Sequence, residues 1–223
     1  MSGRFFMIKH RRFIHYKHPF DFKWNVSHNE QLLDFSEGRA LYSFLNEIYL
    51  WHVPDYKFNS DNVKKASQFV LKNIRKEEIQ ILAKKLEIKG LIKSKRNEPL
   101  SKLTQDVFKR FEKPSKDIIL RYLLVKNENA LAIQIPVWSD KEPVVGHIDL
   151  LLFNTDNKQT IIAELVKGDL LIKYLPVLIK YMELLIERIP TIKNLSGVLF
   201  NRYTAIFINY SSVGDIINFL NIK

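Results

Sequence analysis

Three apolar runs in the second half of the chain constrain its fold most strongly. They span residues 131–138, 144–153 and 160–166, and a short polar turn at Asp156 and Asn157 separates the last two. Runs of this length that are rich in Ile, Leu and Val, with turn residues between them, indicate β-strands. Consecutive strands joined by so short a turn pair antiparallel. We therefore expect a sheet at the centre of the second half of the chain.

Helical patterns on either side of these runs predict the remaining elements. Ser60-Asp61 would cap a helix that reaches residue 74, and Pro114-Ser115 would start another that stops near residue 127. Pro176 either kinks the next helix or stands in its first turn. We also expect helices at 37–51, 77–86, 100–111 and from 212, and short strands at 197–200 and 204–208. This order predicts an α/β fold, with a mixed sheet flanked by helices and a mainly helical N-terminal region before it.

The positive charge is concentrated in two N-terminal blocks. The formal net charge is +11, of which residues 1–24 supply +5 and residues 61–98 supply +6. Such asymmetry favours a polyanionic partner, here DNA, although solvated helix faces would give the same composition. The first block mixes aromatic rings with bases, which suits nucleic acid, but the rings can equally pack on the body of the protein. The candidate DNA-binding side chains are Arg11, Arg12, Lys93, Lys95 and Arg96.

Three regions follow from these patterns, without a clear linker between them. They are a basic and aromatic arm with a helix at 1–58, a helical and basic module at 59–113, and an α/β core at 114–223.

The absence of cysteine removes disulfides, thiolate catalysis and cysteine-bound zinc together. His10, His15 and His18 do not follow a standard metal-ligand spacing, so zinc is not expected. Charges interrupt the apolar stretches at 1–8 and 170–189, which argues against a signal peptide and a membrane span. We expect a soluble intracellular protein.

Two acids stand inside the apolar strands. Asp149 lies in Gly-His-Ile-Asp-Leu-Leu-Leu, and Glu164 lies in Ile-Ile-Ala-Glu-Leu-Val-Lys-Gly. Carboxylates are rarely buried without a partner, and two of them on consecutive strands can share one divalent cation. The alternative is that each acid pairs with a lysine or faces solvent. His147 shares a strand face with Asp149 and could contact a phosphate, although a lone histidine there is more often packed.

These two strands resemble the core of the PD-(D/E)xK nuclease superfamily, in particular its archaeal branch that resembles Holliday-junction resolvases. The resemblance covers residues 114–210 and implies a restriction-endonuclease-like fold. It implies that Asp149, Glu164 and the main-chain carbonyl of Leu165 bind Mg²⁺ or Mn²⁺. It also implies an acid from the preceding helix, for which Asp117 is the first candidate and Glu112 the second. Residues 77–111 resemble small SAP-like DNA-binding modules, and a plain helical bundle explains them as well.

The chain departs from the family pattern at the lysine. The pattern asks for Glu-x-Lys, but the second residue after Glu164 is Val166. A bulge could turn Lys167 into the site, or Lys173 could supply the amine from the next segment, or catalysis has been lost. We rank the three possibilities in that order.

The resemblance implies a Mg²⁺-dependent DNA endonuclease that hydrolyses phosphodiester bonds, with branched DNA in recombination or repair as a substrate and a homodimer as a compatible assembly. A non-catalytic DNA-binding protein with a degenerate nuclease core is the alternative. A protein-interaction or structural protein is a third possibility.

Overall fold

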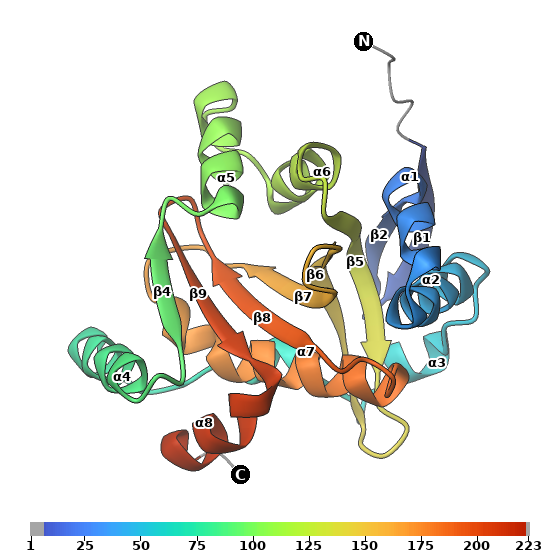
Figure 1. Ribbon diagram of the computed structural model, residues 1–223. Coiled ribbons are helices and arrows are strands. Elements are labelled where there is room, and N and C mark those ends of the chain that lie inside the picture. The colour runs from blue at the N-terminus through green and yellow to red at the C-terminus, as the bar shows by residue number, and fades with distance from the viewer. Residues whose placement is uncertain (1–6, 222–223) are drawn as a thin grey trace.

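One mixed sheet organises the chain. The structure is a computed structural model that describes residues 7–221. Residues 1–6, which hold most of the segment considered as a signal peptide, lie outside that range. The described residues form nine strands in the order β1-β2-β5-β6-β7-β8-β9-β4, with β3 beside β6, and all the neighbouring pairs are antiparallel except β7–β8 and β3–β6. The strands are β1 Ile8–His15, β2 His18–Asn25, β3 Lys64–Lys65, β4 Lys93–Arg96, β5 Ala130–Trp138, β6 Val144–Asn154, β7 Gln159–Leu165, β8 Leu195–Phe200 and β9 Thr204–Asn209 (Figure 1).

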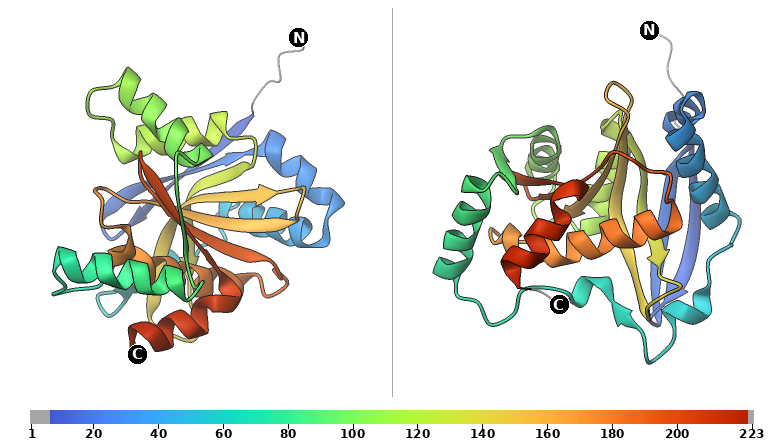
Figure 2. Two further views of the ribbon diagram at one scale, coloured as in Figure 1. Left: turned by 60° about the vertical axis from the view of Figure 1, so that its left-hand side comes forward. Right: turned by 60° about the horizontal axis from the view of Figure 1, so that its bottom comes forward.

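Helices cover both faces of this sheet, which confirms the α/β class. They are α1 Val26–Asn29, α2 Ser36–Tyr49, α3 Asp55–Phe58, α4 Lys76–Ile88, α5 Pro99–Arg110, α6 Lys116–Lys126, α7 Leu175–Arg188 and α8 Val213–Leu220. Helices α5 and α6 bury one apolar cluster against the strands, and α7 buries a larger one with α2. Figure 2 shows α7 running across the strands. No helix within residues 7–221 has both the length and the apolar composition needed to cross a bilayer.

The sequence signals at helix starts explain where α6 and α7 begin. The side chain of Ser115 accepts a hydrogen bond from the main-chain N–H of Ile118, which caps α6 and fixes the position of Lys116 in its first turn. Pro176 stands in the first turn of α7, where its missing N–H costs nothing. The interpretation that places Pro176 at the start of the helix is therefore confirmed.

The helix predicted for 61–74 is wrong. Residues 64–65 form the parallel strand β3, residues 66–68 form a single 3-10 turn, and the next residues have no regular structure. This segment lies beside β6, because Lys64 and Lys65 pair with Val144 and Val145. Further along, the main-chain N–H of Leu71 donates to the carbonyl of Lys173. Tertiary pairing has overridden a weak local preference for helix.

Two basic segments of the N-terminal half, residues 8–25 and 93–96, also form strands that the sequence did not predict. Residues 8–25 form the β1–β2 hairpin, and Phe13, Phe22 and Trp24 are buried in the core, so the aromatic rings of the predicted arm pack on the body. The basic segment expected as a turn at 93–96 is the edge strand β4. All three regions predicted from the sequence therefore contribute strands to the same sheet.

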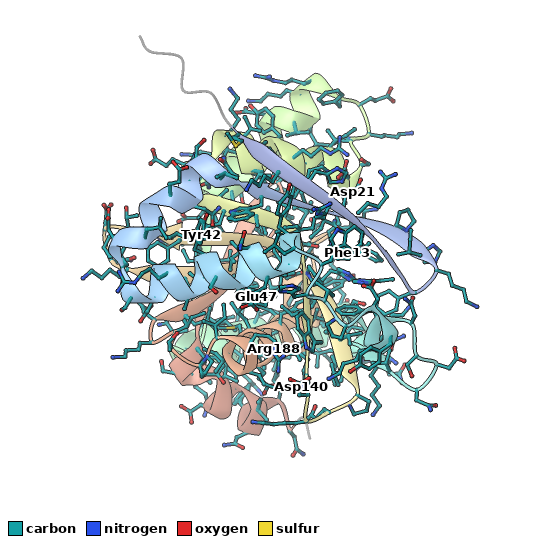
Figure 3. The ribbon with its side chains drawn as sticks, turned by 90° about the vertical axis from the view of Figure 1, so that its right-hand side faces the viewer. Phe13, Asp21, Tyr42, Glu47, Asp140 and Arg188 are labelled. Atoms are coloured by element: carbon teal, nitrogen blue, oxygen red, sulfur yellow. The ribbon has the colours of Figure 1, made fainter. Side chains whose placement is uncertain are left out.

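Asp21 is the centre of the charges on the hairpin. Its carboxylate accepts hydrogen bonds from Arg12 and His10, and Lys23 lies within 3.9 Å. Figure 3 views this side of the molecule and shows Asp21 and Phe13 on the hairpin, with Asp140 and Arg188 close together beyond α2. The Arg12 hydrogen bond, with smaller contributions from His10 and Lys23, holds the pKa of Asp21 well below its ordinary 3.8, although partial burial opposes this.

Asp21→Asn should lower the melting temperature of the protein at neutral pH by about 2–4 °C. Because the pKa of Asp21 is lower in the folded than in the unfolded protein, its stabilisation is complete above the unfolded pKa of about 4 and is lost as the pH falls below it. Thermal unfolding at several pH values should show the gap between wild type and variant closing in acid. Asp61→Asn, at an exposed position, is the matched control. A gap that is constant down to about pH 2 would contradict the assignment.

Candidate functional site

Asp149 and Glu164 face each other where β6 and β7 separate. Regular pairing between these strands ends at Leu150 and Ala163, one position before the two acids. Beyond that point β6 continues with β5, and β7 continues with β8. We call this point, where β6 and β7 separate, the fork. Here hydrogen bonds to side chains replace the main-chain hydrogen bonds between the two strands. The N–H of Asp149 donates to Oε1 of Glu164 at 2.9 Å, and the N–H of Leu165 donates to Oδ2 of Asp149 at 3.0 Å.

Both carboxyl groups are buried. Asp149 is 4% exposed and Glu164 is 7% exposed. Burial, followed by the charge of Asp149, raises the pKa of Glu164 well above its ordinary value, and the nearby Lys116 only partly opposes this. The charge of Asp149 therefore disfavours the charge of Glu164, and additional positive charge at the fork would stabilise Glu164 as a carboxylate.

Lys116 reaches the pair from the first turn of α6. Its Nζ lies 2.6 Å from Oδ1 of Asp149, and its side chain is 40% exposed. Burial opposes the charge on Lys116, but the carboxylates of Asp149 and Glu164 outweigh it and raise the pKa of the amine above 10.5. The structure thus brings together an aspartate, a glutamate and a charged lysine. The sequence did not point to Lys116, because a lysine at a helix start far from both strands has no local signal.

A cavity of about 280 Å³ opens at the fork. The three charged residues line it together with Gly146 and His147 of β6, Leu165 and Val166 after β7, Tyr174, Val177 and Tyr181 around the start of α7, and Phe20, Ser67 and Gln134. The carboxylate oxygens of Asp149 and Glu164 in this cavity suit a hard cation. Mg²⁺ is commonly held by one or two carboxylates, with water and substrate phosphate completing its shell. The pair therefore fits Mg²⁺.

The third acid predicted from the helix does not join this pair. Asp117 accepts a hydrogen bond from Lys23 at 3.2 Å and pairs with Arg121 at 2.7 Å. Glu112 is exposed in the loop before α6. Within residues 7–221 no cluster of three or more acidic or histidine side chains could hold a metal ion. Any metal at the fork would therefore rest on two carboxylates and main-chain or water oxygens.

The two lysines proposed for the family position lie elsewhere. Lys167 is exposed two residues beyond the end of β7, and Lys173 is half-buried in the 3-10 turn Leu171–Tyr174. In the described part of the chain neither forms an ion pair with Asp149 or Glu164, and Lys116 takes that position instead. Lys167 lines a second, larger cavity beside the fork.

His147 belongs to a buried chain of polar groups. Its Nε2 lies 2.8 Å from Nδ1 of His15, and Nε2 of His15 lies 2.9 Å from the half-exposed carboxylate of Asp55. Phe20 stacks on His147 at 3.8 Å, and Phe58 stacks on His15 at 3.9 Å. Burial lowers the pKa of both histidines. With both rings neutral, His15 donates to Asp55 and His147 donates to His15, so the chain fixes the orientation of His147 beside the fork.

The predicted DNA-binding cations are divided between two edges of the sheet. Arg11 donates to the carbonyl of Tyr49 and lies over the rings of Tyr49 and Trp51, while Arg12 is paired with Asp21. Lys93, Lys95 and Arg96 are exposed on the opposite edge strand β4, where Lys95 also pairs with Glu98. Contact of these side chains and of His147 with DNA stays a prediction.

Gly146 allows α7 to approach the fork. A Cβ atom at this position would lie 2.4 Å from the ring of Tyr181 and 2.9 Å from the Cβ of Ala66. Burial, with the charges of Glu164 and Asp149, raises the pKa of Tyr181 well above its ordinary value, so its hydroxyl stays protonated beside the carboxyl pair.

Gly146→Ala should destabilise the protein by about 1–3 kcal/mol, because the tightly packed ring and strand must move apart. Denaturant unfolding measures this. Gly214→Ala is the control, since a Cβ there meets nothing within 4 Å and α8 gains a better helix former. Equal stability of the two variants would contradict the close packing at Gly146.

Comparison of the chain with family models, with curated proteins and with solved structures found no match. The structure itself shows a mixed α/β sheet that forks at two buried acids, Asp149 and Glu164, with the partly exposed Lys116 beside them.

Proposed function

We propose that the protein is a metal-dependent DNA endonuclease of the PD-(D/E)xK type, which hydrolyses phosphodiester bonds. The observation that carries this proposal is the geometry of the fork, where two buried carboxylates on adjacent strands meet a lysine from the preceding helix. An acid pair with a nearby amine is the combination that cleavage of a charged phosphate needs.

The order of elements around the fork supports the restriction-endonuclease-like assignment. Helix α6 precedes the antiparallel strands β5, β6 and β7, and the crossover helix α7 leads to β8, which runs parallel to β7. This is the order of helices and strands that the sequence patterns predicted for the second half of the chain. Asp149 and Glu164 lie on the second and third strands of that set, which are the two strands that carry the resemblance.

Asp149 and Glu164 would hold Mg²⁺ or Mn²⁺ together with the main-chain carbonyl of Leu165. When bound, the ion would neutralise the scissile phosphate and lower the pKa of a water molecule. Lys116 stabilises the negative charge that develops on the phosphate, because its charge is maintained by the same carboxylates. The buried Tyr181 lines the cavity at the fork, together with Phe20, which stacks on His147.

A non-catalytic DNA-binding protein is the second candidate. The 2.6 Å ion pair between Lys116 and Asp149 favours it, because a lysine can neutralise a buried acid without any metal. In that case the cluster would be a structural remnant of a nuclease core.

Cleavage assays separate these candidates. Purified protein is incubated with branched and with linear DNA, with Mg²⁺ and with EDTA, and metal binding is followed by calorimetry. The endonuclease proposal expects cleavage that requires the metal and metal binding that is lost in Asp149→Ala. Absence of cleavage, together with metal binding unchanged by Asp149→Ala, would defeat it. Under the third possibility, the protein does not bind DNA in its function. Its affinity for DNA should then depend only weakly on salt concentration, and this dependence should not change when Lys93, Lys95 and Arg96 become alanine.

A further inference from the structure

A second cavity, of about 540 Å³, lies directly beside the fork. It is bounded by the end of α5, the loop before α6, the segment after β7 and the turn between β8 and β9. Lys116, Leu165 and Val166 line both cavities, so the larger one adjoins the cavity that holds the acid cluster. We call this larger cavity the side groove.

The side groove is strongly basic. Lys113, Lys116, Lys167 and Arg202 line it, and Asp169 is its one acidic lining residue among those described. Lys116 is paired with Asp149, but Lys113, Lys167 and Arg202 form no ion pair with any described residue. Three cations without an acidic partner among the described residues, around one concave surface, favour a ligand that carries several negative charges.

The side groove also offers an aromatic surface. The guanidinium of Arg202 lies 4.6 Å from the ring centre of Tyr203 and 4.9 Å from that of Phe108. Tyr203 is 49% exposed, so part of its ring remains open to a ligand. Proteins hold single-stranded nucleic acid with aromatic rings and nearby lysine or arginine side chains. The bases stack on the rings, and the phosphates contact the cations.

The basic edge strand β4 ends at this groove. Arg96 pairs with Thr204 in the sheet, and the N–H of Asn97 donates to the carbonyl of Tyr203. The exposed cations of β4 therefore lie close to Tyr203. The groove extends from Tyr203 to Lys116, which lies beside the acid cluster. The volume of the groove is within the range of pockets for small ligands, about 300–1,000 Å³, which suits individual nucleotides rather than a duplex.

We propose that the side groove binds a single-stranded segment of DNA next to the phosphate that is cleaved. A base stacks on Tyr203, and Lys113 and Lys167 contact the phosphates on either side of it. A base inside a duplex is already stacked on both faces, so the ring distinguishes unpaired DNA, as in a flap or at a branch, from plain duplex. This inference rests on the proposed nuclease function and names the substrate feature that the site selects.

Binding without metal tests the inference independently of cleavage. An oligothymidine strand and a duplex of equal length, each with a fluorescent end label, are titrated with protein in EDTA and followed by anisotropy. Tyr203→Ala should weaken binding of the single strand about tenfold, within the range of about 5- to 150-fold expected for loss of one stacking contact. Tyr203→Phe keeps the ring and should change the affinity less than about twofold. Duplex affinity should change equally little in both variants.

Two further variants complete the design. Tyr56→Ala removes another ring, which is 74% exposed and lies away from the groove, and should leave single-strand binding unchanged. Lys113→Ala combined with Lys167→Ala should reduce the slope of log affinity against log salt by about 1.4 for the single strand, because two phosphate contacts are lost. Melting curves check that each variant is folded.

Equal weakening of single strand and duplex by Tyr203→Ala, or weakening as large in Tyr203→Phe, would overturn the inference. So would tighter binding of single-stranded RNA than of the matching DNA. The outcomes also separate this inference from the nuclease proposal. Tyr203-dependent binding of the single strand, with no cleavage and with metal binding unchanged by Asp149→Ala, would defeat the nuclease proposal and support the groove as a site for single-stranded DNA. Metal-dependent cleavage with binding indifferent to Tyr203 would do the reverse.

Discussion

Asp149→Asn should lower the single-turnover rate of DNA cleavage by about a thousandfold or more. The substitution keeps the shape of the side chain and an oxygen that can accept the N–H of Leu165, but it removes the negative charge that would hold the metal. Glu164→Gln should have an effect of the same order, because the two acids act on one ion. Their combined loss should not exceed the larger single loss by much, since residues that act as a unit are not additive.

Asp117→Asn provides the matched control for this prediction. Asp117 is an acid on the same helix as Lys116, but its contacts are Lys23 and Arg121, outside the fork. We expect less than about a threefold change in rate, because the residue does not touch the reacting groups. A loss at Asp117 as large as that at Asp149 would mean that the helix acid belongs to the site after all. Normal cleavage by both Asp149→Asn and Glu164→Gln would place the chemistry elsewhere in the molecule.

Lys116→Ala should reduce cleavage by about a hundred- to a thousandfold, the usual cost of removing one group that stabilises developing charge. Single-turnover rates of Lys116→Ala, Lys167→Ala and Lys173→Ala with the same DNA decide among the three lysines. Lys167→Ala should affect binding more than the rate at saturating DNA, since Lys167 lies in the side groove. Lys173→Ala should be close to wild type. A larger rate loss in either of the last two would contradict the role of Lys116.

The same substitution should change stability in a metal-dependent way. Without Lys116 the two buried carboxyl groups lose the cation beside them, and we expect a loss of about 1–3 kcal/mol in EDTA, less than for a fully buried pair because the lysine is 40% exposed. If Mg²⁺ binds at the fork, its addition should restore more stability to Lys116→Ala than to wild type. Failure of Mg²⁺ to stabilise either protein would favour the non-catalytic alternative.

The elements that could be predicted from sequence are those with strong local patterns. Strands β5, β6 and β7, with their buried acids, are continuous apolar runs, and α2, α5, α6 and α7 have clear periodicity or capping residues. The hairpin β1–β2 and the strands β3 and β4 are polar and basic, and they became strands through pairing with distant partners such as β5, β6 and β9. No local pattern reports such pairing.

The candidate site shows the same division. Asp149 and Glu164 were predictable because an acid inside an apolar strand is costly and therefore conspicuous. Lys116 and His15 were not, because each stands in a segment where its residue type is ordinary. Only the capped start of α6 brings Lys116 to Asp149, and only the tertiary contact of the last residue of β1 with β6 brings His15 to His147.

The strand order affects whether the second half of the chain can be produced alone and how the whole chain folds during synthesis. Strand β2 completes one side of β5 and β4 completes the free side of β9, although both precede residue 114. A fragment that begins there would leave two unpaired strand borders, which invite association with other chains. During synthesis the hairpin β1–β2 emerges long before β5 exists. We therefore expect residues 114–223 to require residues 1–113 for solubility, and the whole chain to fold slowly through long-range pairing.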